Sequence, residues 1–186
     1  MARTRLYVGG MTTTFTAMVQ PIGERIIIRL PDTASAELPS RGQVAADVRL
    51  NGHEFATVVE PDGRRGHWLA LDDVVDPVGL SAGDIVDVEI APTKAWPEPD
   101  LPEDFASALA AAADIHEVWA DITPMARWEW VRWVKATGSQ QTRSRRVEVS
   151  VDKLRSGHRR PCCFDLSSCT DPELARSGKL IEAQPG

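Results

Sequence analysis

The hydrophobic pattern of this chain changes its period once, at a proline-rich segment, and this change limits the fold more than any other feature. The segment APTKAWPEPDLP, residues 91–102, holds four of the thirteen prolines. Before it, apolar residues alternate with polar ones, as in strands that bury one face; after it, they recur every three or four residues, as in amphipathic helices. The sequence therefore predicts an α+β protein in which a stiff linker joins a β part to a helical part.

The part before the linker predicts a small barrel of short strands. Residues 43–50 alternate clearly, and β-branched residues are frequent in 12–20 and 25–30. Asn51 and Gly52 follow, and this pair is typical of a two-residue hairpin turn because both positions need a positive φ. Three more strands, in HEFATVVE, GHWLAL and DIVDVEI, and a short helical turn in DDVVDPVG complete the prediction of a closed or partly closed barrel.

The part after the linker predicts helices, two of which form an antiparallel hairpin. Thr123 followed by Pro124 is typical of a helix N-cap with proline at the first position, and Gly138 ends that helix. A second helix is expected from about Gln140 to Ser156, with Gly157 as its C-terminal stop. The short connection favours an αα-hairpin. The predicted parts are a small β-barrel domain at 1–91, a linker at 92–102, a helical domain at 103–160 and a Cys-containing tail at 161–186.

The segment MARWEWVRWVKATGSQQTRSRRVE, residues 125–148, is both aromatic and basic in a chain of net charge −6. At 100° per residue, Trp130 and Trp133 fall on the helix face that meets the second helix, so we expect them in the core. Trp128 and Arg132 fall on the opposite face. The candidate binding residues are therefore Trp128 and three arginines of the second helix, Arg143, Arg145 and Arg146.

Two interpretations of the arginines stay open. In one, they lie on a solvated helix face and form pairs such as Arg145 with Glu148. In the other, they form an anion site together with Arg159 and Arg160.

Motifs that resemble catalytic sites are incomplete in this chain. GLSAG matches a nucleophile elbow at Ser81, but the next residues begin a strand instead of a helix, so we expect Ser81 in a plain turn. HEVWA, residues 116–120, lacks the second histidine of a zinc-protease helix. No glycine-rich phosphate-binding motif occurs in the sequence. The sequence predicts a protein that is not an enzyme and has no cofactor.

The cysteines are few and clustered. His158, Cys162, Cys163 and Cys169 are candidate ligands for zinc or copper, but their spacing is unlike that of a zinc knuckle, so we predict no metal site. An odd number of cysteines within eight residues argues against an extracellular disulfide framework and favours a cytoplasmic location. No apolar run is long enough for a transmembrane helix, so we expect no membrane insertion.

Two stretches resemble known bacterial families. RGQVAADVRLNGHEF and GHWLALDDVVDPVGLSAGDIVDVEI resemble a small β-barrel domain of unknown function. LPEDFASALAA and ITPMARWEWVRWVKATGSQQTRSRRVEVSVDKLRSG resemble the YdeI/OmpD-associated, or bacteriocin-protection, family, in which Thr142, Arg143, Arg145 and Arg146 fit a T-R-x-R-R run. The resemblance implies a barrel of the double-split type followed by a helical domain. It implies no established reaction.

These observations favour a non-enzymatic cytoplasmic binding protein, with a role in stress or bacteriocin protection implied by the resemblance. The expected partner is an anionic ligand or an acidic protein. One alternative is nucleic-acid binding through the arginines of the helical hairpin. The other is a metal or small-molecule site in the Cys/His tail or at a barrel mouth near His53 and His67.

Overall fold

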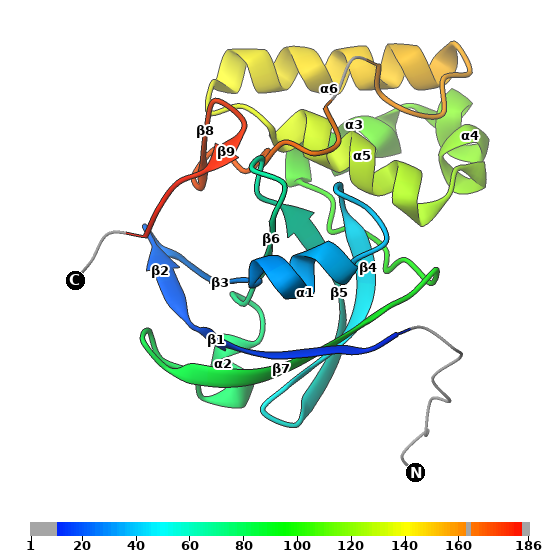
Figure 1. Ribbon diagram of the computed structural model, residues 1–186. Coiled ribbons are helices and arrows are strands. Elements are labelled where there is room, and N and C mark those ends of the chain that lie inside the picture. The colour runs from blue at the N-terminus through cyan, green and yellow to red at the C-terminus, as the bar shows by residue number, and fades with distance from the viewer. Residues whose placement is uncertain (1–10, 163–164, 184–186) are drawn as a thin grey trace.

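The computed structural model describes residues 11–162 and 165–183, and it has the predicted α+β architecture. Seven antiparallel strands form one strongly curled sheet, a half-barrel, and helices follow it in the chain and cover one end of it (Figure 1). The order in the sheet is β1-β7-β4-β5-β6-β3-β2. The strands are β1 (Thr13–Met18), β2 (Gln20–Ile22), β3 (Arg25–Arg29), β4 (Val44–Leu50), β5 (His53–Pro61), β6 (His67–Ala70) and β7 (Ile85–Pro92).

The curl of the sheet follows from how the chain connects its edges. The edge strands β1 and β2 are consecutive in sequence and only Val19 lies between them. The predicted hairpin between β4 and β5 is confirmed, since Asn51 and Gly52 have φ angles of 46° and 86°. Inward-facing side chains of all the long strands fill the half-barrel, among them Val48 and Ile90, which are 1% and 0% exposed.

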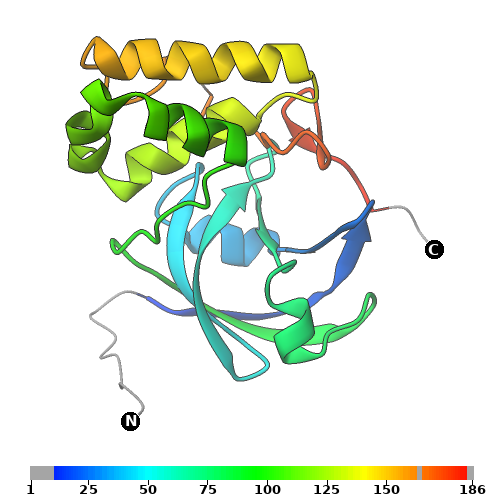
Figure 2. The ribbon, with the colours of Figure 1, turned by 180° about the vertical axis from the view of Figure 1, so that it is seen from behind.

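The helical part contains α3 (Glu103–Ala111), the 3-10 turn η1 (Ala113–Ile115), α4 (His116–Asp121), α5 (Pro124–Lys135) and α6 (Gln140–Arg155). The predicted N-cap is confirmed, because Thr123 Oγ1 accepts a hydrogen bond from the backbone N–H of Ala126 at 3.3 Å. Gly157, with φ of 81°, follows α6 as predicted. Trp130 is fully buried between the helices and meets the half-buried Trp133 edge to face at 6.2 Å. Figure 2 shows the linker running from β7 up to α3.

Two short helices belong to the β part. The predicted helical turn is α2 (Val75–Val78), whereas α1 (Asp32–Glu37) was not predicted from the sequence. Ser35 of α1 is buried and shares a hydrogen bond of 2.7 Å with Nδ1 of His67. This contact attaches α1 to β6.

The tail is more ordered than its sequence suggests. It forms a small hairpin of β8 (Ala175–Arg176) and β9 (Lys179–Leu180), and buried Leu174 and Leu180 pack on Ile27 and Trp68. Ile27 and Trp68 belong to β3 and β6, whose neighbouring residues face the half-barrel core, so the tail covers the outer side of these strands. Strands of two residues are too short to leave a periodic pattern in the sequence. Among the described residues, no helix is long and apolar enough to span a bilayer.

Candidate anion-binding surface

Trp128, the aromatic candidate for partner contact, is used inside the molecule. Its indole N–H donates to the carbonyl of Pro97 at 2.7 Å, and its side chain is half-buried. The linker therefore docks on α5 through this residue.

The three arginine candidates do not converge. Arg143 forms a two-pronged pair with Asp104 of α3, with N···O distances of 2.6 and 2.8 Å, and this partner holds the pKa of Asp104 below its usual value. Arg146 donates to the carbonyls of Trp133 and Ala136 at the C-terminal end of α5, and its guanidinium lies 5.5 Å from the Trp133 ring centre. Arg145 is exposed.

Arg132, predicted on the face of α5 opposite Trp130 and Trp133, is buried against the sheet and the tail. Arg132 is 5% exposed, its Nε lies 3.3 Å from a carboxylate oxygen of Glu60 in β5, and its Nη2 donates to the carbonyl of Ser168 at 2.9 Å. Gln43 donates a hydrogen bond of 2.6 Å to the same carboxylate, and burial raises the pKa of Glu60. The second face of α5 is thus buried against the sheet and the tail by a polar contact that helical projection does not detect.

Other polar groups of α5 are also occupied within the chain. Arg127 pairs with Glu98 at 2.7 Å and donates to the carbonyl of Trp119 at 3.1 Å. The indole N–H of Trp130 donates to the carbonyl of Arg159 at 3.2 Å. The aromatic and basic segment therefore joins the linker, the helices, the sheet and the tail to one another.

A different set of cations gathers where two tight turns stack. The turn between β5 and β6 lies against the turn between β8 and β9, and Leu180 N–H donates to the carbonyl of Asp62 at 2.8 Å. The approach requires glycine, since a Cβ on Gly63 would lie 1.9 Å from the carbonyl oxygen of Gly178, and Gly63 has φ of 72°. Two turns more than a hundred residues apart in sequence thus form one surface.

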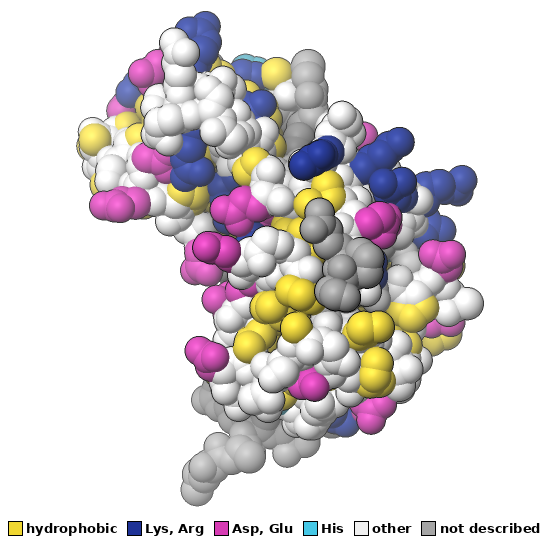
Figure 3. Space-filling model, turned by 90° about the vertical axis from the view of Figure 1, so that its left-hand side faces the viewer, with side chains coloured by type: hydrophobic (Ala, Val, Ile, Leu, Met, Phe, Trp, Pro, Cys, Tyr) yellow, Lys and Arg dark blue, Asp and Glu magenta, His cyan; other side chains and the backbone are white. Residues whose placement is uncertain are grey.

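The cations on this surface are exposed, and no carboxylate of the described residues pairs with them. Arg64 and Arg65 lie in the first turn, Arg176 and Lys179 flank the second, and Arg41 reaches the first turn by donating to the carbonyl of Arg65 at 3.1 Å. Within residues 11–162 and 165–183, none of the five forms an ion pair. We call Arg41, Arg64, Arg65, Arg176 and Lys179 the turn cations. Figure 3 looks at the side that carries the β8–β9 hairpin and shows Lys and Arg side chains gathered at its upper right.

Asp62, the carboxylate of the first turn, accepts hydrogen bonds from the backbone of that turn. Oδ1 of Asp62 accepts hydrogen bonds from the N–H groups of Arg64 and Gly66 at 2.6 and 2.8 Å. Across the second turn, Arg176 and Lys179 are directly opposed in the antiparallel register. Like charges in that position repel each other, so the local sequence favours the hairpin less than a neutral or opposite pair would.

Ser81 lies in an exposed turn, as predicted. The backbone N–H of Ser81 donates to the Asp84 carboxylate at 2.8 Å. The chain then enters β7 at Ile85 and does not form a helix. A nucleophile elbow needs a helix at this point.

The proposed barrel mouth does not bring its two histidines together. His67 is 1% exposed, its Nε2 shares a 3.1 Å hydrogen bond with the carbonyl of Gly42, and burial lowers its pKa. His53 is exposed at the start of β5, whereas His67 pairs with Pro61 at the end of that strand. Eight residues of strand separate the two positions, about 26 Å when measured along the strand at about 3.3 Å per residue. The two histidines of the barrel-mouth hypothesis therefore lie at opposite ends of β5.

The cysteine tail is spread over two environments. Cys169 is 3% exposed in the apolar cluster under the tail, and burial raises the pKa of its thiol to about 11. Cys162 is exposed and lies beside the ammonium group of Lys153. Cys163 lies outside the described residues. In the described part of the chain, no three His, Cys, Asp or Glu side chains are grouped as metal ligands.

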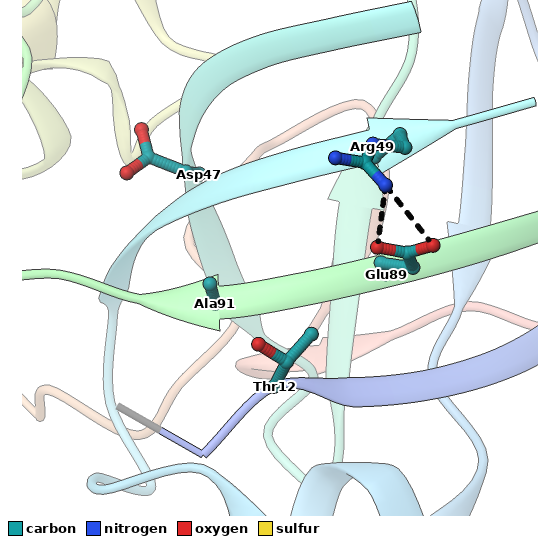
Figure 4. Close-up of a pocket in the computed structure, with 5 residues that line it drawn as sticks. All are labelled: Thr12, Asp47, Arg49, Glu89 and Ala91. Carbon is teal, nitrogen blue, oxygen red and sulfur yellow. Dashed lines mark hydrogen bonds and ion pairs between the residues drawn. The ribbon is translucent and has the colours of Figure 1, made fainter. Parts of the chain in front are cut away.

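A shallow hollow lies on the outer face of β1, β7 and β4. Thr12, Asp47, Arg49, Glu89 and Ala91 line it (Figure 4). Arg49 donates to Glu89 at 3.2 Å and also to Glu54 at 2.7 Å, so carboxylates on both sides neutralise its charge. This hollow lacks the free positive charge of the turn surface.

Comparison with known families assigns both parts of the chain. Residues 15–90 match the family described as a domain of unknown function, DUF1905, and residues 98–157 match the family described as Bacteriocin-protection, YdeI or OmpD-Associated. No curated protein matches the chain. The matches include three of the turn cations, whereas Arg176 and Lys179 lie beyond both.

Proposed function

Since residues 98–157 match the bacteriocin-protection, YdeI or OmpD-associated family and residues 15–90 match DUF1905, we propose that the chain is a non-enzymatic protein that binds an anionic partner through the turn cations. One observation carries this proposal: five exposed cations from three separate segments meet on stacked turns without ion-pair partners among the described residues. A cytoplasmic location and a role in protection, the latter suggested by the family description alone, are parts of the same proposal.

The contrast with the rest of the chain supports this choice of surface. The net charge is −6, and most other arginines of the described chain face a carboxylate. A cation that already has such a partner gains little from an external anion, because binding must first replace the internal pair. Arg143 is paired with Asp104 in this way, and Arg146 is engaged with two backbone carbonyls and the Trp133 ring, which favours the turn cations over the helical hairpin.

Proximity of uncompensated like charges also favours an anionic partner. Each turn cation raises the electrostatic free energy of its neighbours, and this cost falls when an anion binds between them. Positions that oppose local stability without an internal compensation are frequent at functional sites.

The test is retention on immobilised heparin, a general polyanion, with elution by a salt gradient. We expect the double variant R64Q/R65Q to elute at clearly lower salt than the wild type. The matched control is K94Q/R145Q, which removes the same charge from exposed residues elsewhere and should elute with the wild type. Equal elution of the two variants would contradict the proposal.

A further inference from the structure

We propose that the anionic partner is the phosphodiester backbone of double-stranded nucleic acid, contacted by the turn cations without reading of the bases. This inference rests on the proposed function and narrows it to one class of partner. Three features of the surface support it: its shape, its choice of cation and its lack of exposed aromatic rings. Its small size limits the number of phosphates that it can contact.

The shape of the surface favours an extended polyanion over a small phosphate compound. Small ligands bind in concave pockets that bury most of their surface. The turn cations instead lie in or beside two exposed turns, and Asp62 already occupies backbone N–H groups that a single phosphate would need. Only the side chains remain available, and side chains spread over two turns suit several phosphates in a row.

The choice of cation favours phosphate as the anionic group. Four of the turn cations are arginines, and the planar guanidinium contacts two phosphate oxygens at once. Arg41 uses Nη1 to contact backbone carbonyls, which holds its side chain beside the first turn. The opposed Arg176 and Lys179 lie on neighbouring strands, where side chains are about 5 Å apart, close enough for both to contact one phosphate or two adjacent ones.

The aromatic residues near the surface are not available for stacking. In residues 60–68 and 174–181 the aromatic side chains are His67 and Trp68, which are 1% and 3% exposed. The indole N–H of Trp68 is also engaged, since it donates to the carbonyl of Pro61 at 3.1 Å. Binding of single strands depends on bases that stack on exposed aromatic rings. A duplex, whose bases are already stacked and whose phosphates face outward, fits this surface better.

The size of the surface sets a limit that can be measured. Neutralising one duplex phosphate contributes about −0.9 to the slope of log K against log salt, so five contacts give a slope no steeper than about −4.5. The acidic remainder of the protein restricts additional contacts. Contacts to phosphates alone also imply affinity that is independent of sequence.

The experiment measures fluorescence anisotropy of labelled duplex DNA, of two unrelated sequences, over a series of salt concentrations. The wild type should bind both duplexes equally, with a slope between about −3 and −4.5. R64Q/R65Q and R176Q/K179Q, which alter different turns, should each lose at least tenfold in affinity at low salt and make the slope shallower by about 2. K94Q/R145Q should bind like the wild type, and melting temperatures of all variants verify that they are folded.

Three outcomes would overturn the inference. The first is the absence of duplex binding at low salt; if heparin retention still depends on Arg64 and Arg65, the anion-binding function stands and the partner is of another class, such as an acidic protein. The second is duplex binding that is weakened by K94Q/R145Q and not by the turn variants. The third is tighter binding of single-stranded DNA that survives the loss of the turn cations.

Discussion

The contact between Arg132 and Glu60 provides the sharpest test of how the two parts of the chain are joined. Replacement of Arg132 with methionine keeps most of the side-chain volume and removes the charge. It leaves the carboxylate of Glu60, whose side chain is 18% exposed, with a hydrogen bond from the Gln43 amide. We expect the variant to fold and to lose stability at neutral pH.

The magnitude follows from distance and burial. At 3.3 Å, two unit charges attract with about 5 kcal/mol at an effective dielectric constant of about 20. Removal of one partner of a buried pair typically costs about 3–5 kcal/mol, because the other charge stays buried and unpaired. Glu60 keeps some contact with solvent, so we expect a loss of about 3 kcal/mol, at the lower end.

The pH dependence has a definite sign. Burial raises the pKa of Glu60 in the folded state, so the stability associated with its protonated form is fully present below the unfolded pKa and is lost as pH rises through the folded pKa. Without Arg132 this pKa rises further, because a favourable charge next to the carboxylate is gone. The deficit of Arg132→Met should therefore be largest near neutral pH and shrink in mild acid, where Glu60 takes up a proton.

The assay is urea denaturation followed by tryptophan fluorescence at about pH 7 and about pH 5, the window in which the raised pKa acts. Arg155→Met is the control, because the Arg155 and Asp114 side chains are 49% and 52% exposed and solvent screens such pairs, so its loss should be much smaller. The double variant E60L/R132M should recover most of the loss. The reasoning would be refuted if Arg132→Met were as stable as the wild type at neutral pH, or if its deficit grew in acid.

Three further predictions concern the turns, the linker and the tail. Gly63→Ala should lower the melting temperature and speed proteolysis of the tail, since its Cβ would lie 1.9 Å from the Gly178 carbonyl oxygen; unchanged proteolysis would mean that the turns do not stack as described. Trp128→Phe removes the 2.7 Å hydrogen bond to Pro97 and should cost about 1 kcal/mol in urea denaturation, whereas no change would show that the linker docks without it. Cys169 should resist alkylation, read by mass spectrometry, until denaturant is added, because its thiol is buried with a pKa of about 11; rapid labelling of the folded protein would contradict its burial.

Local patterns were sufficient to predict the main elements. The Asn51-Gly52 turn, the Thr123 cap and the burial of Trp130 each depend on a few neighbouring residues, and each was predicted correctly. The helix α1 was missed because its six residues include few apolar side chains, and it is attached through Ser35 to His67, 32 residues away. Sequence patterns report such partners poorly, because tertiary contacts decide them.

The turn cations were missed for a related reason. Each turn shows a local signal, two cations beside a glycine in PDGRRG and in ARSGKL, but neither signal is unusual alone. Only the stacking of Gly63 on Gly178 makes them one surface, and this packing of two distant glycines leaves no periodic trace. A search of the sequence for turns that combine glycine with two cations would have identified all of them except Arg41.

Density of basic residues in the sequence was a poor guide to free positive charge. Residues 125–160 look strongly basic, yet Arg127, Arg132, Arg143, Arg155 and Arg159 all pair with carboxylates that come from outside that segment. Their field is therefore largely cancelled at the distances over which a partner would be attracted. The two turns carry fewer cations, but those cations have no such partners among the described residues, so the field there persists. What distinguishes an anion-binding surface in this chain is the convergence of uncompensated cations, and for that reason the experiments compare Arg64 and Arg65 with Arg145 at equal loss of charge.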